Sequence, residues 1–105
     1  MDSAFSKKIY DNLKKVPHGF VTTYKELSKS INSKAYRAVG NALRNNPYAP
    51  VVPCHRVVKS DGSIGGFNGK TDGVEIQNKI KLLLNEGVII KKNKVADFNN
   101  KLYKF

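Results

Sequence analysis

The stretch that decides the reading of this chain is Pro50-Val51-Val52-Pro53-Cys54-His55-Arg56-Val57-Val58. It contains the only cysteine of the 105 residues, followed directly by one of the two histidines. Apolar residues flank this pair, and a proline fixes its own φ while favouring extended geometry in the residue before it. We therefore predict a stiff, mostly buried strand that presents the Cys54 sulfur in one fixed direction.

The chemistry of Cys54 depends on its neighbours. A cysteine reacts as the thiolate, and a free thiol with a pKa of about 8.5 is mostly protonated at neutral pH. A nearby imidazole or cation lowers that pKa, and His55 and Arg56 are placed in the sequence to do so. The alternative is a core cysteine beside an unrelated histidine, because free cysteine is among the most buried residue types.

The length and composition of the chain limit the classes of protein it can belong to. A chain of 105 residues forms one small domain with a single core. One cysteine excludes an internal disulfide framework, and one cysteine with two histidines makes a poor zinc site. No apolar run approaches the roughly 20 residues of a membrane-spanning helix, and lysines interrupt the N-terminal apolar residues of any signal peptide. We expect a cytoplasmic protein without membrane, metal or cofactor.

The charge of the chain is strongly positive. There are 19 Lys and Arg residues against 8 Asp and Glu residues, which gives a formal net charge of +11. A domain this basic favours a polyanionic partner, with nucleic acid first. The alternative is a lysine-rich solvated surface without such a partner, and charge alone does not separate the two.

The N-terminal half predicts helices. Apolar residues recur on one face between Ser3 and Val16, and the Pro17-His18-Gly19 turn ends that helix. His18 is expected to be solvated, without a catalytic role. Thr23 and Glu26 have the spacing of a capping box, so a second, short helix starts there.

A third helix is predicted from Lys34 to Asn45, with Ser33 as its N-cap. Two short helices joined by a short turn form a helix-turn-helix motif. Its inner face is predicted to hold Tyr36, Val39 and Leu43, and its outer face Arg37, Asn41 and Arg44, with Gly40 between them. A glycine inside a helix costs about 1 kcal/mol relative to alanine, so Gly40 suggests close packing against something, and a small residue flanked by arginines allows close approach to a nucleic-acid backbone. A solvated polar face is the alternative.

The C-terminal half predicts short strands, a loop and one helix. We expect residues 56–58 and 63–64 to form a hairpin and the glycine-rich loop 65–69 to form a pocket wall. The loop lacks the Lys-Ser/Thr ending of a phosphate-binding loop. A helix is expected from about Gly73 to Glu86, capped by Asp72 and ended by Gly87, with a strand at residues 88–90. Its buried stripe is expected to contain Ile76, Ile80, Leu83 and Leu84.

Glu86 is unusual, because an acid in the last turn of a helix opposes the helix dipole. Either this carboxylate is solvated and slightly unfavourable, or a nearby imidazole or cation holds it. A carboxylate within reach of His55 would orient the ring and stabilise its protonated form. Spacing alone does not establish that contact.

Taken together, these pieces resemble the catalytic domain of the DNA alkyltransferases, the methylated-DNA–protein-cysteine methyltransferases that repair 6-O-alkylguanine. The resemblance spans Phe5 to Val88. It rests on the motifs Pro53-Cys54-His55-Arg56-Val57, Val21-Thr22-Thr23-Tyr24, Tyr36-Arg37-Ala38-Val39-Gly40, Asn45-Asn46-Pro47 and Asn85-Glu86-Gly87. It implies a mainly α (α+β), winged helix-turn-helix-like catalytic domain with a small β-hairpin. Residues 1–105 are then one domain, without the N-terminal accessory domain that family members often carry.

The resemblance also implies catalytic roles. Cys54 matches the acceptor nucleophile, and His55 matches the base that removes the thiol proton through a water. Glu86 matches the acid that holds this histidine. Asn46 matches the asparagine that bridges the helix-turn-helix to the active-site strand, and Tyr24 matches the tyrosine that assists proton delivery to the departing guanine.

Further positions match the DNA surface and the pocket for the extruded base. Arg37 matches the arginine that enters the base stack, and Ala38 and Gly40 match small residues that face the minor groove. The DNA surface is completed by Thr23, Asn41 and Arg44. The walls of the base pocket are matched by Leu43, Val57, Ile64, Gly66, Phe67, Asn68 and Gly69.

The function that the resemblance implies is irreversible, one-turnover transfer of an alkyl group from 6-O-alkylguanine to Cys54 after base flipping. 4-O-alkylthymine is left open as a further substrate. The partner is double-stranded DNA with alkylated guanine, and the protein is expected to be a monomer. Two local departures stand out, since Phe67 replaces a usual tyrosine and residues 70–75 look like a short insertion.

Three other functions fit parts of the same pattern. Alkyltransferase-like binding proteins flip the damaged base but replace the cysteine, and Cys54 argues against that class. A helix-turn-helix regulator would read sequence in the major groove of undamaged DNA. A cysteine hydrolase would need an oxyanion hole, which the sequence does not locate.

Overall fold

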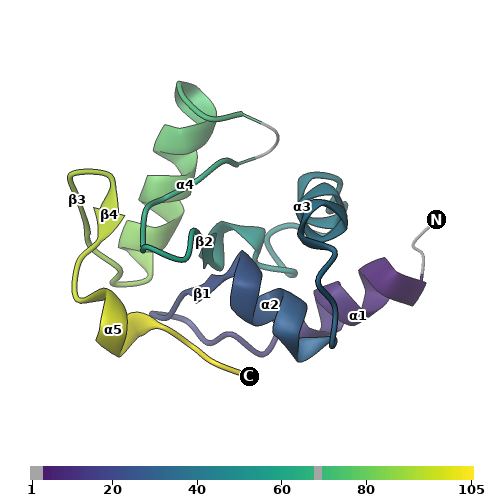
Figure 1. The fold of residues 1–105 in the computed structure, drawn as a ribbon. Coiled ribbons are helices and arrows are strands. Elements are labelled where there is room, and N and C mark those ends of the chain that lie inside the picture. The colour runs from purple at the N-terminus through teal and green to yellow at the C-terminus, as the bar shows by residue number, and fades with distance from the viewer. Residues whose placement is uncertain (1–3, 68–69) are drawn as a thin grey trace.

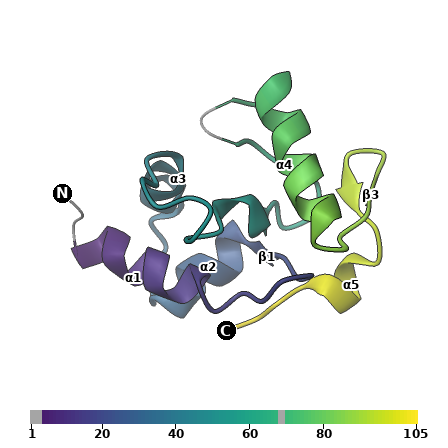
Figure 2. The same cartoon turned by 180° about the vertical axis from the view of Figure 1, so that it is seen from behind.

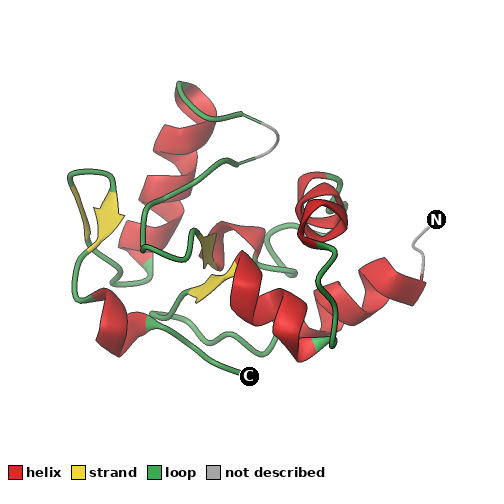
Figure 3. Cartoon of the chain, in the orientation of Figure 1, coloured by secondary structure: helices red, strands yellow, loops and turns green. Residues whose placement is uncertain are grey.

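The computed structural model describes residues 4–67 and 70–105. Helices carry most of the regular structure, and each strand is two residues long (Figure 3). The helices are α1 (Ala4–Leu13), α2 (Tyr24–Ser30), α3 (Tyr36–Arg44), the 3₁₀ helix η1 (Cys54–Arg56), α4 (Val74–Asn85) and α5 (Phe98–Lys101). The strands are β1 (Thr22–Thr23), β2 (Val57–Val58), β3 (Ile90–Lys91) and β4 (Lys94–Val95). The predicted α+β class is confirmed, with β3–β4 as its small hairpin.

Two apolar clusters lie on either side of the β1–β2 ladder. Helices α1, α2 and α3 gather on one side, and α4 with the β3–β4 hairpin lies on the other (Figures 1 and 2). Cys54 and Val57 belong to the first cluster, whereas Val58 belongs to the second. The segment that carries Cys54 therefore runs along the boundary between the two clusters. Among the described residues, no helix is long and apolar enough to cross a membrane.

The strand after Cys54 pairs in parallel with β1, in the register Thr22 to Val57 and Thr23 to Val58. The predicted hairpin of residues 56–58 with 63–64 is therefore wrong. The turn itself is present, because the Lys59 N–H donates to the Ser63 carbonyl at 2.9 Å. Val57 and Val58 are almost completely buried, and that burial comes from packing between the two clusters, which local sequence does not reveal.

Cys54 starts a 3₁₀ helix, so the prediction that it lies in a strand is wrong. The Arg56 N–H donates to the Pro53 carbonyl at 2.9 Å, and the Val57 N–H donates to the Cys54 carbonyl. Pro53 has φ −83° and ψ 70°, and a proline ring favours such a φ. The proline thus precedes a tight turn that aims Cys54, and the extended strand begins only at Val57.

The helix-turn-helix is formed by α2 and α3. Thr23 is the predicted N-cap of α2, with its hydroxyl accepting from the Glu26 N–H at 3.0 Å. Ser33 is not the N-cap of α3, since it accepts from the Ala35 N–H in the turn before the helix. Tyr36 was predicted to face inward but is 50% exposed.

Helix α1 braces the last turn of α3. The Tyr10 hydroxyl donates to the Ala42 carbonyl at 2.7 Å, and both residues are buried. Val39 and Leu43 are buried in the same cluster, as predicted for the inner face of α3. The position of α3 is therefore fixed from behind by α1.

Helix α4 differs from the prediction at two places. Its N-cap is Gly73, without a side-chain bond, so Asp72 does not cap it. Leu84 was predicted to be buried but is 54% exposed, and Lys79 is completely buried instead. The predicted end at Gly87 is confirmed, because its φ of +86° permits a Schellman motif in which its N–H donates to the Leu84 carbonyl.

Candidate active site

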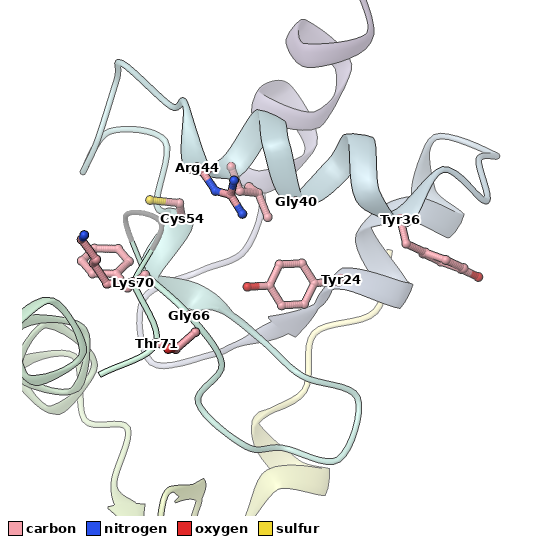
Figure 4. A pocket seen from close by; sticks show the side chains of 10 residues that line it. Tyr24, Tyr36, Gly40, Arg44, Cys54, Gly66, Lys70 and Thr71 are labelled. Carbon is pink, nitrogen blue, oxygen red and sulfur yellow. The ribbon is translucent and has the colours of Figure 1, made fainter. Parts of the chain in front are cut away.

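A pocket of about 380 Å³ lies beside Cys54, between α3 and the loop before α4 (Figure 4). Cys54 is 8% exposed and its sulfur reaches this pocket from η1. Tyr24 enters from the first turn of α2, and its hydroxyl is directed toward the side of Cys54 and Gly66 (Figure 4). The pocket is lined by Tyr24, Tyr36, Gly40, Leu43, Arg44, Cys54, Gly66, Phe67, Lys70 and Thr71.

The resting state of Cys54 is the thiol. Burial raises the pKa of Cys54, and this effect exceeds the lowering by a hydrogen bond with Asn46 and by the charge of Lys79. The prediction that His55 and Arg56 lower this pKa below its usual value is therefore wrong. The sulfur is stored protonated, and a base is needed to activate it.

His55 has the properties of that base. It is 2% exposed, and its Nε2 lies 2.9 Å from Oε2 of Glu86. Burial lowers the pKa of His55 more than the Glu86 carboxylate raises it, so the ring is neutral at pH 7. In a neutral ring, Nε2 carries the hydrogen donated to the carboxylate and Nδ1 is left as a proton acceptor.

Glu86 also binds Arg56, which the sequence places near Cys54 but does not pair with this acid. Arg56 Nε donates to Oε1 at 2.8 Å, and Nη2 donates to Oε2 at 2.7 Å. Burial raises the pKa of the Glu86 carboxyl, but hydrogen bonds from Arg56 and His55 outweigh burial and leave that pKa lowered. The predicted contact between Glu86 and an imidazole is present, and it explains the acid at the end of α4.

Lys79 is a residue of the site that sequence reasoning missed. Its side chain is completely buried, and Nζ donates to the carbonyls of Val57 at 2.8 Å, Ile64 at 2.6 Å and Gly66 at 3.0 Å. Burial lowers the pKa of Lys79 to about 7. One ammonium group thus connects the strand after Cys54 with the Gly66 wall of the pocket.

Asn46 connects α3 to the segment before Cys54. Its Nδ2 donates to the Val52 carbonyl at 2.8 Å, and its Oδ1 accepts from the Tyr48 N–H at 2.9 Å. Burial, followed by the charge of Cys54, raises the pKa of the Tyr24 hydroxyl. Asn46 thus bonds the segment before Cys54, and both Asn46 and Tyr24 are electrostatically linked to the Cys54 sulfur.

The residues proposed for DNA contact are only partly gathered on one surface. Arg37, Asn41 and Arg44 are exposed on α3, as predicted for its outer face, and Ala38 is half-buried. A Cβ built at Gly40 meets no atom within 4 Å, so this position leaves open space above the helix. Thr23 is 3% exposed and its hydroxyl accepts the N-cap hydrogen bond, which leaves little of it for DNA.

The residues expected to form the base pocket divide into a lining and a backing. Leu43, Gly66 and Phe67 line the pocket. Val57 and Ile64 are completely or almost completely buried behind it, where their carbonyls accept from Lys79. Asn68 and Gly69 lie outside the described residues. Within the described ranges, no group of three or more His, Cys, Asp or Glu side chains is placed to hold a metal ion.

The order of these elements matches a known family. Residues 4–88 match the family model described as 6-O-methylguanine DNA methyltransferase, DNA binding domain. The chain belongs to this family. A methylated-DNA–protein-cysteine methyltransferase of Candida glabrata is 40% identical over 95 residues, which are 90% of this chain and 44% of that protein. The chain spans 38% to 50% of the length of eight such curated relatives.

Solved structures of the family show the same fold. S. pombe Atl1, in complex with damaged DNA containing O6-carboxymethylguanine, has a TM-score of 0.83 at 27% identity, with both chains covered completely. Mycobacterium tuberculosis OGT in complex with DNA has a TM-score of 0.74 at 34% identity, covering 83% of this chain and 51% of that one. The winged helix-turn-helix-like expectation thus agrees with the structures of these relatives.

Proposed function

We propose that this chain repairs DNA by moving an alkyl group from 6-O-alkylguanine, and from 4-O-alkylthymine as a further class, to Cys54 in a single irreversible turnover. The observation that carries the proposal is a lone thiol at the wall of a pocket, next in sequence to a buried histidine paired with a carboxylate. The 105 residues then act as one catalytic domain, equivalent to the C-terminal part of longer family members, and as a monomer.

The proposed transfer starts from the thiol. His55 Nδ1 takes the Cys54 proton through a water, and Glu86 stabilises the resulting imidazolium. The sulfur forms a bond to the alkyl carbon while the bond between that carbon and O6 breaks, and the electron pair stays with guanine. Guanine receives a proton from the Tyr24 hydroxyl, which is replaced from His55 through solvent. The S-alkyl thioether is stable, so the protein is consumed.

The alkyl carbon is unreachable inside a duplex, so the nucleotide must first leave the stack, at a cost of a few kcal/mol. Helix α3 supplies a surface for the minor groove, with Gly40 open above the helix and Arg37 exposed on it. An inserted Arg37 side chain offsets part of the unstacking energy. Asn41 and Arg44, exposed on the same helix, are proposed to contact the phosphates.

A second candidate function is lesion binding without transfer. The full-length match to S. pombe Atl1 on damaged DNA favours it. The thiol at Cys54 favours transfer, because a pure binding protein has no use for a nucleophile in that wall.

Intact-mass measurement after incubation with duplex DNA containing 6-O-methylguanine separates the two functions. Transfer predicts that the protein mass rises by one methyl group in place of one hydrogen, and that peptide mapping locates it at Cys54. Cys54→Ser is the matched control, which keeps the pocket and DNA binding but acquires no methyl group. Binding to the lesion without any mass change would select the second candidate.

The role of Arg37 is tested separately. Arg37→Ala is expected to slow repair of duplex DNA by about tenfold, since about 1.4 kcal/mol of unstacking energy is no longer offset. Reaction with free 6-O-benzylguanine, which needs no flipping, should be nearly unchanged. Equal slowing of both reactions would argue against an inserting arginine.

A further inference from the structure

His18, the second histidine of the chain, lies against the same carboxylate as His55. Its Nε2 is 3.6 Å from Oε2 of Glu86, and the His55 Nε2 is 2.9 Å from that same oxygen. The two imidazoles differ in exposure, because the His18 side chain is 70% exposed and that of His55 only 3%. One carboxylate oxygen thus joins a solvent-facing imidazole to a buried one.

The turn that carries His18 is held in place on both sides. Arg56 Nη1 donates to the Val16 carbonyl at 2.8 Å, just before the turn. Gly19 follows His18 with a φ of +88°, and a Cβ at this glycine would lie 3.3 Å from the Glu86 backbone oxygen. The backbone on either side of His18 is therefore packed against the residues of the base, and His18 is not on a freely moving loop.

We propose that His18 is a positioning residue for the base, in that its charge sets how strongly Glu86 supports the imidazolium of His55. The proposal rests on the function proposed above. When His18 is neutral, Glu86 serves His55 and Arg56. When His18 is protonated, it shares Oε2 and repels the second positive charge on His55, so the step that removes the Cys54 proton becomes less favourable.

Of the side chains that face Glu86, that of His18 is the most exposed to solvent. Glu86 faces His55, Arg56 and His18, and His55 is influenced by Glu86, Arg56 and the buried Lys79. An arginine stays charged throughout the physiological range, whereas an imidazole changes charge near neutral pH. Lys79 is the same in every variant compared below, so its titration cancels from their differences.

Proton NMR titration tests the coupling without any substrate, because the chain has only two histidines. His18→Gln leaves no charge at this position, and His18→Lys leaves a permanent one. We expect His55 to titrate at a pH higher by roughly half a unit in His18→Gln than in His18→Lys. Lys15→Gln, which removes an exposed charge without contact to Glu86, is the matched control.

The kinetic consequence is measured as the single-turnover rate of methyl transfer between pH 6 and 8. The rate of His18→Lys is expected to be about threefold below that of His18→Gln, since half a pH unit of basicity is lost. Lys15→Gln should follow the wild type at every pH.

Each outcome bears on one of the two proposals. Identical His55 titrations in His18→Gln and His18→Lys, or an equal shift in Lys15→Gln, would overturn the inference about His18. A shift in titration without any difference in transfer rate would also overturn its role in positioning the base. Absence of transfer in the wild type contradicts the proposed function instead, and the NMR result would then still report whether His18 and His55 are coupled.

Discussion

Two cations near Cys54, Arg56 and Lys79, are stabilised in different ways. Arg56 forms a two-point ion pair with Glu86, with side chains that are 13% and 9% exposed. Lys79 is completely buried and its Nζ donates to three backbone carbonyls. The comparison shows two solutions to the same problem, since a buried charge must be paired or fully hydrogen-bonded.

The consequence of this difference is electrostatic. The charge of Lys79 lowers the pKa of Cys54, whereas Arg56 lowers the pKa of Glu86 and that of His55. Glu86, paired with Arg56, therefore maintains the base (the carboxylate side), and Lys79, bound to backbone carbonyls, supports the thiolate (the carbonyl side). Variants on each side should separate these two contributions.

The largest effect is expected from Glu86→Ala. Arg56 would lose its carboxylate, and breaking a buried pair on one side destabilises a protein by roughly 3 kcal/mol. Urea unfolding measures the free energy, and Asp72→Ala, an exposed acid next to α4, should change it by less than about 0.5 kcal/mol. Replacing both partners, with Arg56→Met added, should recover part of the loss. A double variant as unstable as the single one would mean that the ion pair is not the cause.

Lys79→Met should have the next largest effect on stability. Three buried carbonyls lose their donor, and the expected loss is about 2 kcal/mol, because desolvation of the ammonium is relieved at the same time. The matched control is Lys81→Met, which removes an exposed lysine from the same helix. If Lys79→Met were as stable as the control, the three bonds would contribute nothing net.

The pH dependence of stability is expected to differ between the wild type and Lys79→Met. The pKa of Lys79 is about 7 in the folded chain against 10.5 for an ordinary lysine. Between these values the unfolded chain binds more protons, so stability rises with pH. The wild type should therefore gain about 1 kcal/mol relative to Lys79→Met between pH 7 and 8. Unfolding of both proteins at matched pH values measures this difference, and a constant or falling difference would contradict it.

The smallest effect concerns the reactivity of the thiol. Without the positive charge of Lys79, the pKa of Cys54 rises further, and alkylation by iodoacetamide at pH 7 should slow by about threefold. Lys81→Met should react at the wild-type rate. Equal rates in Lys79→Met and the wild type would show that the carbonyl side does not influence the sulfur.

The same contrast explains which parts of the site could be predicted. Glu86 opposes the helix dipole, and that local conflict correctly indicated a partner of opposite charge. Lys79 is stabilised by backbone carbonyls. Every residue has one, so no pattern of side chains in the sequence predicts this interaction. Its place between Ile76 and Leu83 on the inner stripe of α4 was the only indication.

The fold shows a similar division. Capping by Thr23 and termination at Gly87 depend on residues close in sequence, and both predictions were confirmed. The parallel pairing of Val57 with Thr22 joins distant segments, and the turn signal at residues 59–62 suggested a hairpin in its place. The turn at Cys54 was missed because a proline is compatible with both a strand and a tight turn.

The bond from Tyr10 to the Ala42 carbonyl has a consequence for the design of variants. Since the acceptor is a backbone carbonyl, side chains on the exposed face of α3 can be exchanged without removing the hydrogen bond that holds this helix against α1. The outer surface can therefore diversify over generations, or in a laboratory library, while the scaffold beneath it keeps its shape.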